Sequence, residues 1–582
     1  MFFSGGRFRA LAVASLLAAL PACEKKVTGP PPRYVVVRFE NLSGDPALEW
    51  VCRGVSEYLS RSLAGAMDGP VLPVAATARL AGTLGMRPAS APGISTQRSE
   101  AIIAGATRLI SGLVERENGR LRLSAVEEDV ASHRTVRSLA VVDSTPLKAM
   151  AQLARRFSPS AQPYLTTNAD ALRFYVTGLE EPPGPGFTSL RQAIGADPKF
   201  GPAWVALVNA MNLTGNKDAA LDLIAKARNE KLDQYDQANI ELEDATLRDD
   251  PQARIAALRQ ISALSPGDTV LLRSVAQAEA AAGQFEGAAG DWNKLAAVLP
   301  NDADAWNQLG YTRAWGGDYP GALAALKEYA RLRPDDPNSL DSTGDVHFMY
   351  RHYAEAAASY LQASAKDPQF QKGGDLYKAA WAQFLNGDKA KADATFARFR
   401  TAREKSGVRG GTLFQADWLY RTGREKEAMA LLRKDVASGQ SGTDSATLWA
   451  QLTVFDLLEG DRAAAAKDVA GIGQPASPGA LAVRFAALPS ASAEEWSSRA
   501  DKMIQGSGAG AGIRRLALGF ALLLDGKKEA SLPIWKQVVE NTPATDFFSR
   551  AVLARLQGEQ PKLALVPDPN SLNEMRAVLD KL

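Results

Sequence analysis

Hydrophobic and polar residues alternate at two different spacings near the start of this chain. Residues 35–39 are mostly β-branched and apolar, which predicts a strand. Residues 41–45 have turn chemistry, and Asp45 followed by Pro46 predicts a helix start, because aspartate caps N–H groups and proline has none to leave unpaired. Apolar residues then recur at i, i+3, i+4 and i+7 over residues 48–63, which predicts an amphipathic helix.

The segments that follow are short and of mixed type. Asn118-Gly119 stands between two alternating runs, which is a strong hairpin signal. The other predicted elements are a strand at 71–74, an alanine-rich helix after it, a short helix at 98–106, hairpin strands at 108–115 and 120–129, a strand at 134–142 and a helix at 146–157. This order predicts an α+β domain in which helices pack on a small mixed sheet.

A 34-residue period governs the sequence that follows. It is marked by prolines at 198, 266, 300, 334 and 368, by Ala220, Ala288, Ala322 and Ala356, and by Gly215, Gly283 and Gly317. Residues 305–336, "AWNQLGYTRAWGGDYPGALAALKEYARLRPDD", resemble the tetratricopeptide (TPR) consensus. The resemblance implies an all-α TPR superhelical solenoid of paired helices after the α+β domain.

The consensus positions of this copy have a physical explanation. Gly310 and Ala322 are small, because the two helices of a repeat cross closely there, while Trp306 and Leu326 fill the space around the crossing. Gly317 and Asp318 form the turn between the two helices, and Pro334 ends the second helix. The other repeats are residues 339–368 and 202–227, which are close copies, and 376–399, 413–434, 448–470 and 516–543, which are degenerate, with a loop or irregular helical pair at 471–512.

The opening of the α+β domain carries a second resemblance. "VVVRFENLSGDPALEWVCRGVSEYLSRSL" is similar to the start of the TolB-like domain that precedes TPR repeats in CadC-like regulators and adenylate-cyclase-associated proteins. The resemblance implies binding and assembly rather than catalysis. A phosphate-binding loop is the alternative for this strand–loop–helix unit, but it has a single glycine, no lysine, and Asp45 at the anion position.

The first residues predict export rather than fold. Arg7 and Arg9 precede an apolar run at 10–20, which is too short to span a bilayer. The sequence then reads Leu20-Pro21-Ala22-Cys23, which resembles a bacterial lipobox and implies acylation of Cys23; an ordinary signal peptide is the alternative. Glu24 favours the outer membrane slightly, so the chain is expected in the cell envelope, facing the periplasm.

These patterns divide the chain into predicted regions. They are a signal peptide (1–22), a lipidated tether (23–32), the TolB-like domain (33–158), the TPR array (168–400), degenerate TPR-like repeats (401–560) and a C-terminal tail or helix (561–582).

The composition of the chain excludes several kinds of functional site. The chain has 67 basic and 65 acidic residues, a net charge of +2, so a nucleic-acid surface is not expected. Its three histidines are scattered, and no metal site, cofactor or catalytic motif is predicted. Cys52 lies on the apolar side of its helix and is interpreted as core, while Glu127, Glu128 and Asp129 are interpreted as solvated edge charges.

TPR arrays bind partners along a groove lined by the first helix of each repeat, so the resemblance also implies groove residues. They are Arg273, Gln277, Asn307, Gln308, Tyr311, Trp315, Asp341, Asp345, Phe348, Tyr377 and Trp381. Ordinary packing is the alternative for each, most of all for Trp381. The sequence therefore predicts a non-enzymatic scaffold, anchored in the envelope by lipid alone, whose groove binds a partner peptide or helix. The alternatives are a periplasmic sensory module and an enzyme accessory subunit.

Overall fold

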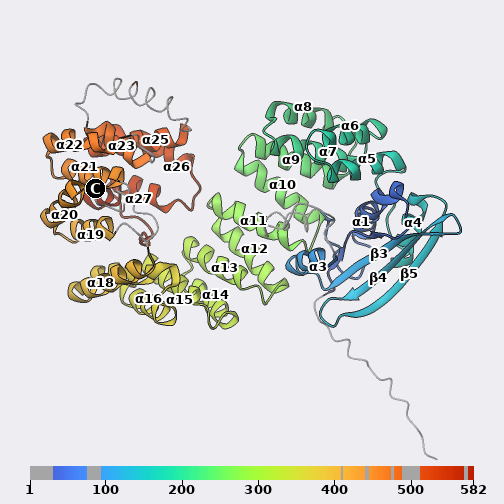
Figure 1. The fold of residues 1–582 in the computed structure, drawn as a ribbon, viewed down its shortest axis with the longest axis horizontal. Helices are drawn as coiled ribbons and strands as arrows, with labels where there is room; N and C mark the ends of the chain where they lie inside the picture. Colours follow the sequence, from blue (N-terminus) through green and yellow to red (C-terminus); the bar gives the residue numbers. More distant parts are fainter. Residues whose placement is uncertain are drawn as a thin grey trace, which may run out of the picture.

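The computed structural model describes residues 31–74, 94–407, 411–438, 445–473, 478–487, 498, 511–568 and 575–582. A small sheet domain is followed by a long curved array of paired helices (Figure 1), as the sequence predicts. The predicted signal peptide, Cys23 and the alanine-rich helix after residue 74 lie outside the described residues. Among the described residues, no helix is both long and apolar enough to cross a membrane.

The N-terminal sheet is mixed and has the strand order β1-β3-β4-β5, with β2 also beside β3. Its strands are β1 (Tyr34–Val36), β2 (Glu40–Asn41), β3 (Arg108–Glu117), β4 (Arg120–Asp129) and β5 (Arg134–Asp143). β1 and β2 run parallel to β3, whereas β3–β4 and β4–β5 are antiparallel. The hairpin prediction is confirmed: Asn118 and Gly119 have φ of 51° and 77°, the left-handed conformation that a tight two-residue turn requires.

Two strand predictions need correction. The strand predicted over 35–39 breaks after Val36, because the N–H of Phe39 donates to the carbonyl of Cys52 on the next helix instead of to a strand. The strand predicted at 71–74 is reduced to a bridge between Val71 and Tyr34. Pro73 has no N–H with which to extend that pairing.

The helices of this domain cover both faces of the sheet. They are η1 (Pro46–Leu48), α1 (Glu49–Leu63), α3 (Ile94–Ile103) and α4 (Pro146–Phe157). The carboxylate of Asp45 accepts the N–H of Ala47 at 2.9 Å, so the predicted cap is confirmed. α1 and α4 share one core with the sheet, and Cys52 is fully buried in it, as predicted. Burial raises the pKa of the Cys52 thiol to about 12.

Glu127 corrects the interpretation of the acidic cluster on β4. Only 2% of this residue is exposed, because it follows Leu123 and Ala125 on the face of the strand that meets the core. Its carboxylate pairs with Arg137 and, at 3.7 Å, with Arg108. Glu127 is therefore a buried, paired charge and not a solvated one.

The helical array consists of antiparallel pairs. Its helices are α5 (Ala169–Glu180), α6 (Pro185–Ala196), α7 (Gly201–Leu213), α8 (Lys217–Ala227), α9 (Gln234–Leu247), α10 (Pro251–Leu264), α11 (Thr269–Ala281), α12 (Phe285–Val298), α13 (Ala303–Gly316), α14 (Tyr319–Leu332), α15 (Asn338–Met349) and α16 (Tyr353–Lys366). The five prolines of the 34-residue grid each follow a helix end by two residues, which confirms the predicted role of Pro334 as a stop and extends it to the other four.

The turn chemistry of the best repeat is also confirmed. Gly317 has a φ of 99° and ends α13, and the Asp318 carboxylate accepts the N–H of Gly321 at 2.9 Å at the start of α14. A Cβ on Gly310 would lie 2.7 Å from Leu326, so the close helix crossing admits no side chain there.

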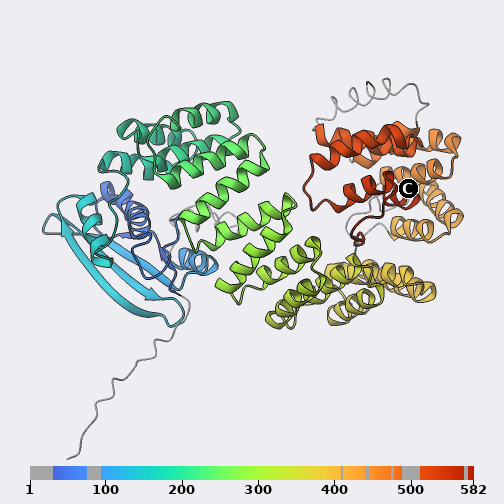
Figure 2. The same cartoon turned by 180° about the vertical axis from the view of Figure 1, so that it is seen from behind.

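The array continues to the C-terminus. Its remaining elements are η2 (Phe370–Gly373), α17 (Gly374–Leu385), α18 (Lys389–Lys405), α19 (Gly411–Arg421), α20 (Glu425–Ser438), α21 (Ser445–Leu458), α22 (Arg462–Asp468), η3 (Val469–Ile472), α23 (Pro478–Ala487), α25 (Ala511–Leu524), α26 (Lys528–Glu540), α27 (Phe547–Leu556) and α28 (Met575–Lys581). Seen from either side, the curvature brings the last helices back toward α11 (Figures 1 and 2).

The sheet domain contacts the array on two sides. α1 packs against α5 in one continuous hydrophobic core. On the other side, the Thr269 hydroxyl donates to the carbonyl of Ala104 at 2.7 Å, and Arg33 donates to the carbonyl of Val298 at 3.3 Å. The domain therefore spans from the first helical pair to α11 and α12.

Candidate partner-binding surfaces

The predicted groove residues fall into two groups in the structure. Gln277 is exposed, and Arg273, Asn307, Gln308, Tyr311 and Trp315 are half-buried on α11 and α13. Asp341, Asp345, Phe348, Tyr377 and Trp381 on α15 and α17 are buried, each 8% exposed or less. The structure corrects the prediction for these five residues, because their side chains offer no surface to a partner in this conformation.

A buried ion cluster accounts for the two aspartates. The ammonium group of Lys378 donates to Asp341 at 2.7 Å and to Asp345 at 2.9 Å. Asp345 also accepts the hydroxyls of Tyr311 and Tyr360, both at 2.8 Å. These groups join α13, α15, α16 and α17, so their role is to hold neighbouring repeats together.

The aromatic residues of α17 belong to the core between repeats. Trp381 lies 4.8 Å from Trp418 between ring centroids, and Tyr377 lies 5.2 Å from Phe399. The open side of Trp381 is covered by the guanidinium of Arg421 at 4.1 Å. The packing alternative therefore holds for Trp381.

The C-terminal part of the chain covers much of what remains. Phe547, at the start of α27, packs on Trp315 with ring centroids 5.9 Å apart. Residues 559–568, here termed the C-terminal strap, lie against the turn between α15 and α16. Asp580 of α28 binds Arg421 at 2.6 Å. The middle of the predicted groove is thus occupied by the protein itself.

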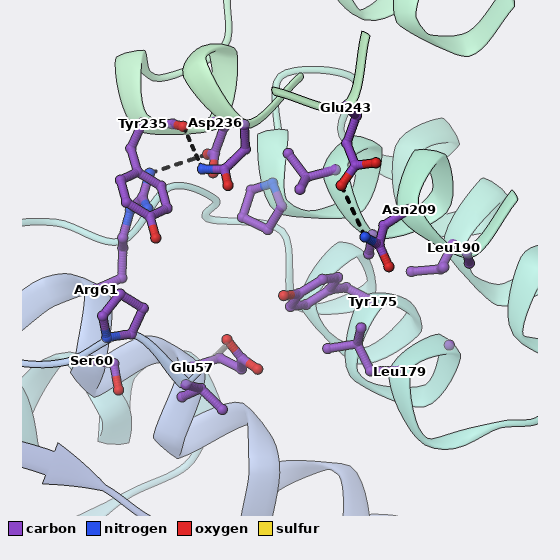
Figure 3. Close-up of a pocket in the computed structure, with 18 of the residues that line it drawn as sticks. Glu57, Ser60, Arg61, Tyr175, Leu179, Leu190, Asn209, Tyr235, Asp236 and Glu243 are labelled. Carbon is purple, nitrogen blue, oxygen red and sulfur yellow. Dashed lines mark hydrogen bonds and ion pairs between the residues drawn. The ribbon is translucent and has the colours of Figure 1, made fainter. Parts of the chain in front are cut away.

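A different cleft opens between the two domains. It has a volume of about 940 Å³ and lies between α1 of the sheet domain and helices α5, α6, α7, α9 and α10 of the array. Figure 3 shows Glu57, Ser60 and Arg61 on one wall and Tyr175, Asn209 and Glu243 on the others. Clefts of this size at domain junctions are common ligand sites.

Arg61 organises one end of the cleft. Its guanidinium pairs with Asp233 and, at 3.2 Å, with Asp236, and it lies 4.5 Å over the ring of Tyr235. Asp236 is 4% exposed, and burial raises its pKa to about 7 in spite of Arg61. Arg61 therefore links α1 to α9 through these contacts.

Two carboxylates of the cleft remain available to a ligand. The Glu243 carboxylate accepts only amide N–H groups, from Asn209 at 2.9 Å and Asn212 at 3.2 Å, and Glu181 accepts the Ser189 hydroxyl at 2.6 Å. Within the described residues, neither carboxylate has a cation within 4 Å. The hydroxyl of Ser60, a residue only 6% exposed, has no hydrogen-bond partner among the described residues.

The cleft also has an apolar side. Leu213, at its margin, is 80% exposed, and Leu264 is 40% exposed. Phe187 and Leu179 add partly buried apolar surface. Exposed leucines beside unpaired carboxylates give the cleft an acidic and apolar character.

A row of charged residues on α1 is a sequence signal for this cleft that the predictions did not include. Arg53, Glu57 and Arg61 recur every four residues on α1, and all three line the cleft. Such a row is usually a solvated helix face. Here, burial raises the pKa of Glu57, because α1 faces the array and not bulk water.

Comparisons with known proteins find a partial likeness. No family model matches the chain, and no curated protein matches it. Among the solved structures, a crystal structure of the MamA protein is 16% identical and covers 30% of this chain and 94% of its own, with a TM-score of 0.26. Residues 41 to the end of MamA from Desulfovibrio magneticus RS-1 are 18% identical and cover 30% of this chain and 97% of their own, with a TM-score of 0.25.

Proposed function

We propose that this chain is a non-enzymatic scaffold of the cell envelope, which holds a segment of a partner protein in the cleft between α1 and the first helical pairs. The observation that carries the proposal is that the cleft has carboxylates without counter-charges next to exposed leucines. Protein surfaces that combine uncompensated charge with apolar area favour a partner of complementary charge and shape.

The partner segment follows from the lining. A lysine or arginine side chain would pair with Glu181 or Glu243, and adjacent apolar residues would cover Leu213. We therefore expect a segment that contains a basic residue flanked by apolar ones.

A photo-cross-linking experiment tests this proposal. A photoreactive amino acid placed at Leu213, in the lipid-free chain that starts at Lys25, should capture the partner from envelope fractions. The same label at Leu385, which is 46% exposed on α17 and away from the cleft, should not capture it. Equal capture at both positions would contradict the assignment of the cleft.

Charge variants then test the chemistry. The double variant Glu181→Gln and Glu243→Gln should lower capture at position 213 at least about tenfold, since each lost ion pair removes on the order of 1 kcal/mol or more from a partly desolvated site. Glu241→Gln is the matched control, because Glu241 lies on the same helix but pairs with Arg228 outside the cleft. If capture by the double variant were unchanged, a basic partner segment would be excluded.

The envelope anchor is proposed from the lipobox resemblance at Cys23. Labelling cells with a palmitate analogue should mark the wild-type chain and leave Cys23→Ala unlabelled. Equal labelling of both would show that the segment is an ordinary signal peptide or is not processed at this cysteine.

A further inference from the structure

The hydrogen bonds between the C-terminal strap and the turn after α15 use main-chain atoms of the strap. Arg351 donates one N–H to the carbonyl of Pro561 at 2.6 Å and another to that of Lys562 at 3.3 Å. The N–H of Ala564 donates to the carbonyl of Met349 at 2.9 Å. Met349 is the last residue of α15, so the strap satisfies a carbonyl that a helix end leaves without an intrahelical partner.

Apolar side chains also anchor the strap, and Leu563 and Pro567 are buried. Leu563 is 8% exposed and joins the hydrophobic cluster of α13, α14 and α15, and Val566 packs on the edge of the same cluster. Lys562, beside the anchor, is exposed. The strap belongs to no helix or strand. Main-chain hydrogen bonds together with a few anchored side chains are how grooves hold extended peptides.

The receiving surface is built from the repeat of α15 and α16. Arg351 has a φ of 64°, an uncommon backbone conformation for a residue with a side chain, at the turn between α15 and α16. Its own repeat fixes that conformation, since the N–H of Arg351 donates to the carbonyl of Phe348 at 2.9 Å. The Arg351 N–H groups that bind the strap therefore belong to the repeat of α15 and α16, which lies about 210 positions before the strap in the sequence.

We propose that the surface formed by Met349, Arg351 and the leucine site of α13–α15 is a second binding surface, specific for an extended apolar peptide segment, which the strap occupies as a built-in ligand. A partner segment of the same pattern, with a buried leucine and a small residue after it, displaces the strap. This surface is separate from the cleft at α1, and its occupation in this structure keeps it closed to partners.

A peptide-binding experiment on the full chain tests the proposal. A fluorescein-labelled peptide of residues 558–568, "GEQPKLALVPD", is titrated with the wild type, with Leu563→Asp and with the control Lys562→Ala, and anisotropy is measured. Leu563→Asp should release the strap and bind the peptide at least tenfold more tightly than the wild type. Lys562→Ala should behave as the wild type.

Two further measurements test where on the chain the peptide binds. Adding Arg351→Ala to Leu563→Asp should lower the affinity again, and a peptide carrying Asp in place of its first leucine should not bind. Peptide binding to neither chain, or equal binding to wild type and Leu563→Asp, would overturn the proposal.

A second variant distinguishes release of the strap from misfolding of the chain. Ala564→Pro removes the N–H that reaches Met349 without adding a charge and should open the surface as Leu563→Asp does. Far-UV circular dichroism reports whether each variant is folded. If both variants were unfolded, the strap would be part of the structural core, and the proposal would fail.

Discussion

The backbone N–H of Ala544 donates a hydrogen bond to the carbonyl oxygen of Ala281 at 2.7 Å, although 263 positions separate the two residues in the sequence. Ala281 ends α11, and Ala544 lies in the loop between α26 and α27. A Cβ built on Gly283 would lie 3.1 Å from the Cβ of Ala544, so the two loops are in contact. Together with the pair of Trp315 and Phe547, this contact closes the curved array on itself.

Ala544→Pro should open this closure, because proline has no N–H to donate. We expect a larger radius of gyration by small-angle X-ray scattering and a loss of stability of about 1 kcal/mol, the usual net value of one hydrogen bond. Ala544→Ser keeps the N–H and should match the wild type. An unchanged scattering curve for the proline variant would mean that the contact does not hold the array closed.

Lys378→Met should strongly destabilise the middle of the array. Lys378 is the cation shared by the buried Asp341 and Asp345, and without it both carboxylates stay buried beside each other. Removing one partner of a buried ion pair costs about 3–5 kcal/mol. Urea unfolding measures the loss. Lys391→Met is the control, because Lys391 forms an exposed pair with Asp388 and should change stability by less than about 1 kcal/mol.

Asp375→Asn should make the stability of the protein less sensitive to a rise in pH. Burial, helped by the negative charge of Asp341, raises the pKa of Asp375 to about 9. Between its unfolded pKa, about 4, and this value, the folded state binds a proton that the unfolded state has lost, so stability falls as pH rises.

The asparagine variant carries no such proton. Its stability relative to the wild type should increase with pH between 6 and 8, by up to about 1.4 kcal/mol for each pH unit. Urea midpoints at the two pH values provide the measurement, and parallel changes in both proteins would show that Asp375 is ionised in the folded state.

Gly344→Ala should destabilise the repeat formed by α15 and α16. A Cβ at this position would lie 2.6 Å from the ring of Tyr360, which is fully buried and cannot move aside. Overpacking of this kind costs about 1–3 kcal/mol. Gly290→Ala on α12 is the matched control, since its Cβ would meet nothing within 4 Å. Alanine should stabilise that helix by about 0.5–1 kcal/mol. A loss at Gly290 as large as at Gly344 would refute the packing argument.

Features set by neighbouring residues were predictable from the sequence. The Asn118-Gly119 turn, the cap at Asp45 and the proline stops depend on backbone preferences within a few residues. The 34-residue period gave the repeats because each helical pair meets its neighbours at the same positions. The groove prediction used the same period and failed at Tyr377 and Trp381, because the period does not report what covers a helix face.

The sequence by itself determined the class of fold, the order of its elements and the crossing points marked by glycine and alanine, since these depend on local sterics and periodic burial. Only the tertiary structure decided which surfaces are open. Arg53, Glu57 and Arg61 became a cleft wall because α1 docks on the array. The middle of the predicted groove was closed because the curvature of the array brought residues 541–568 and 575–582 onto α11–α19, a contact between residues too distant in sequence for any local pattern to encode.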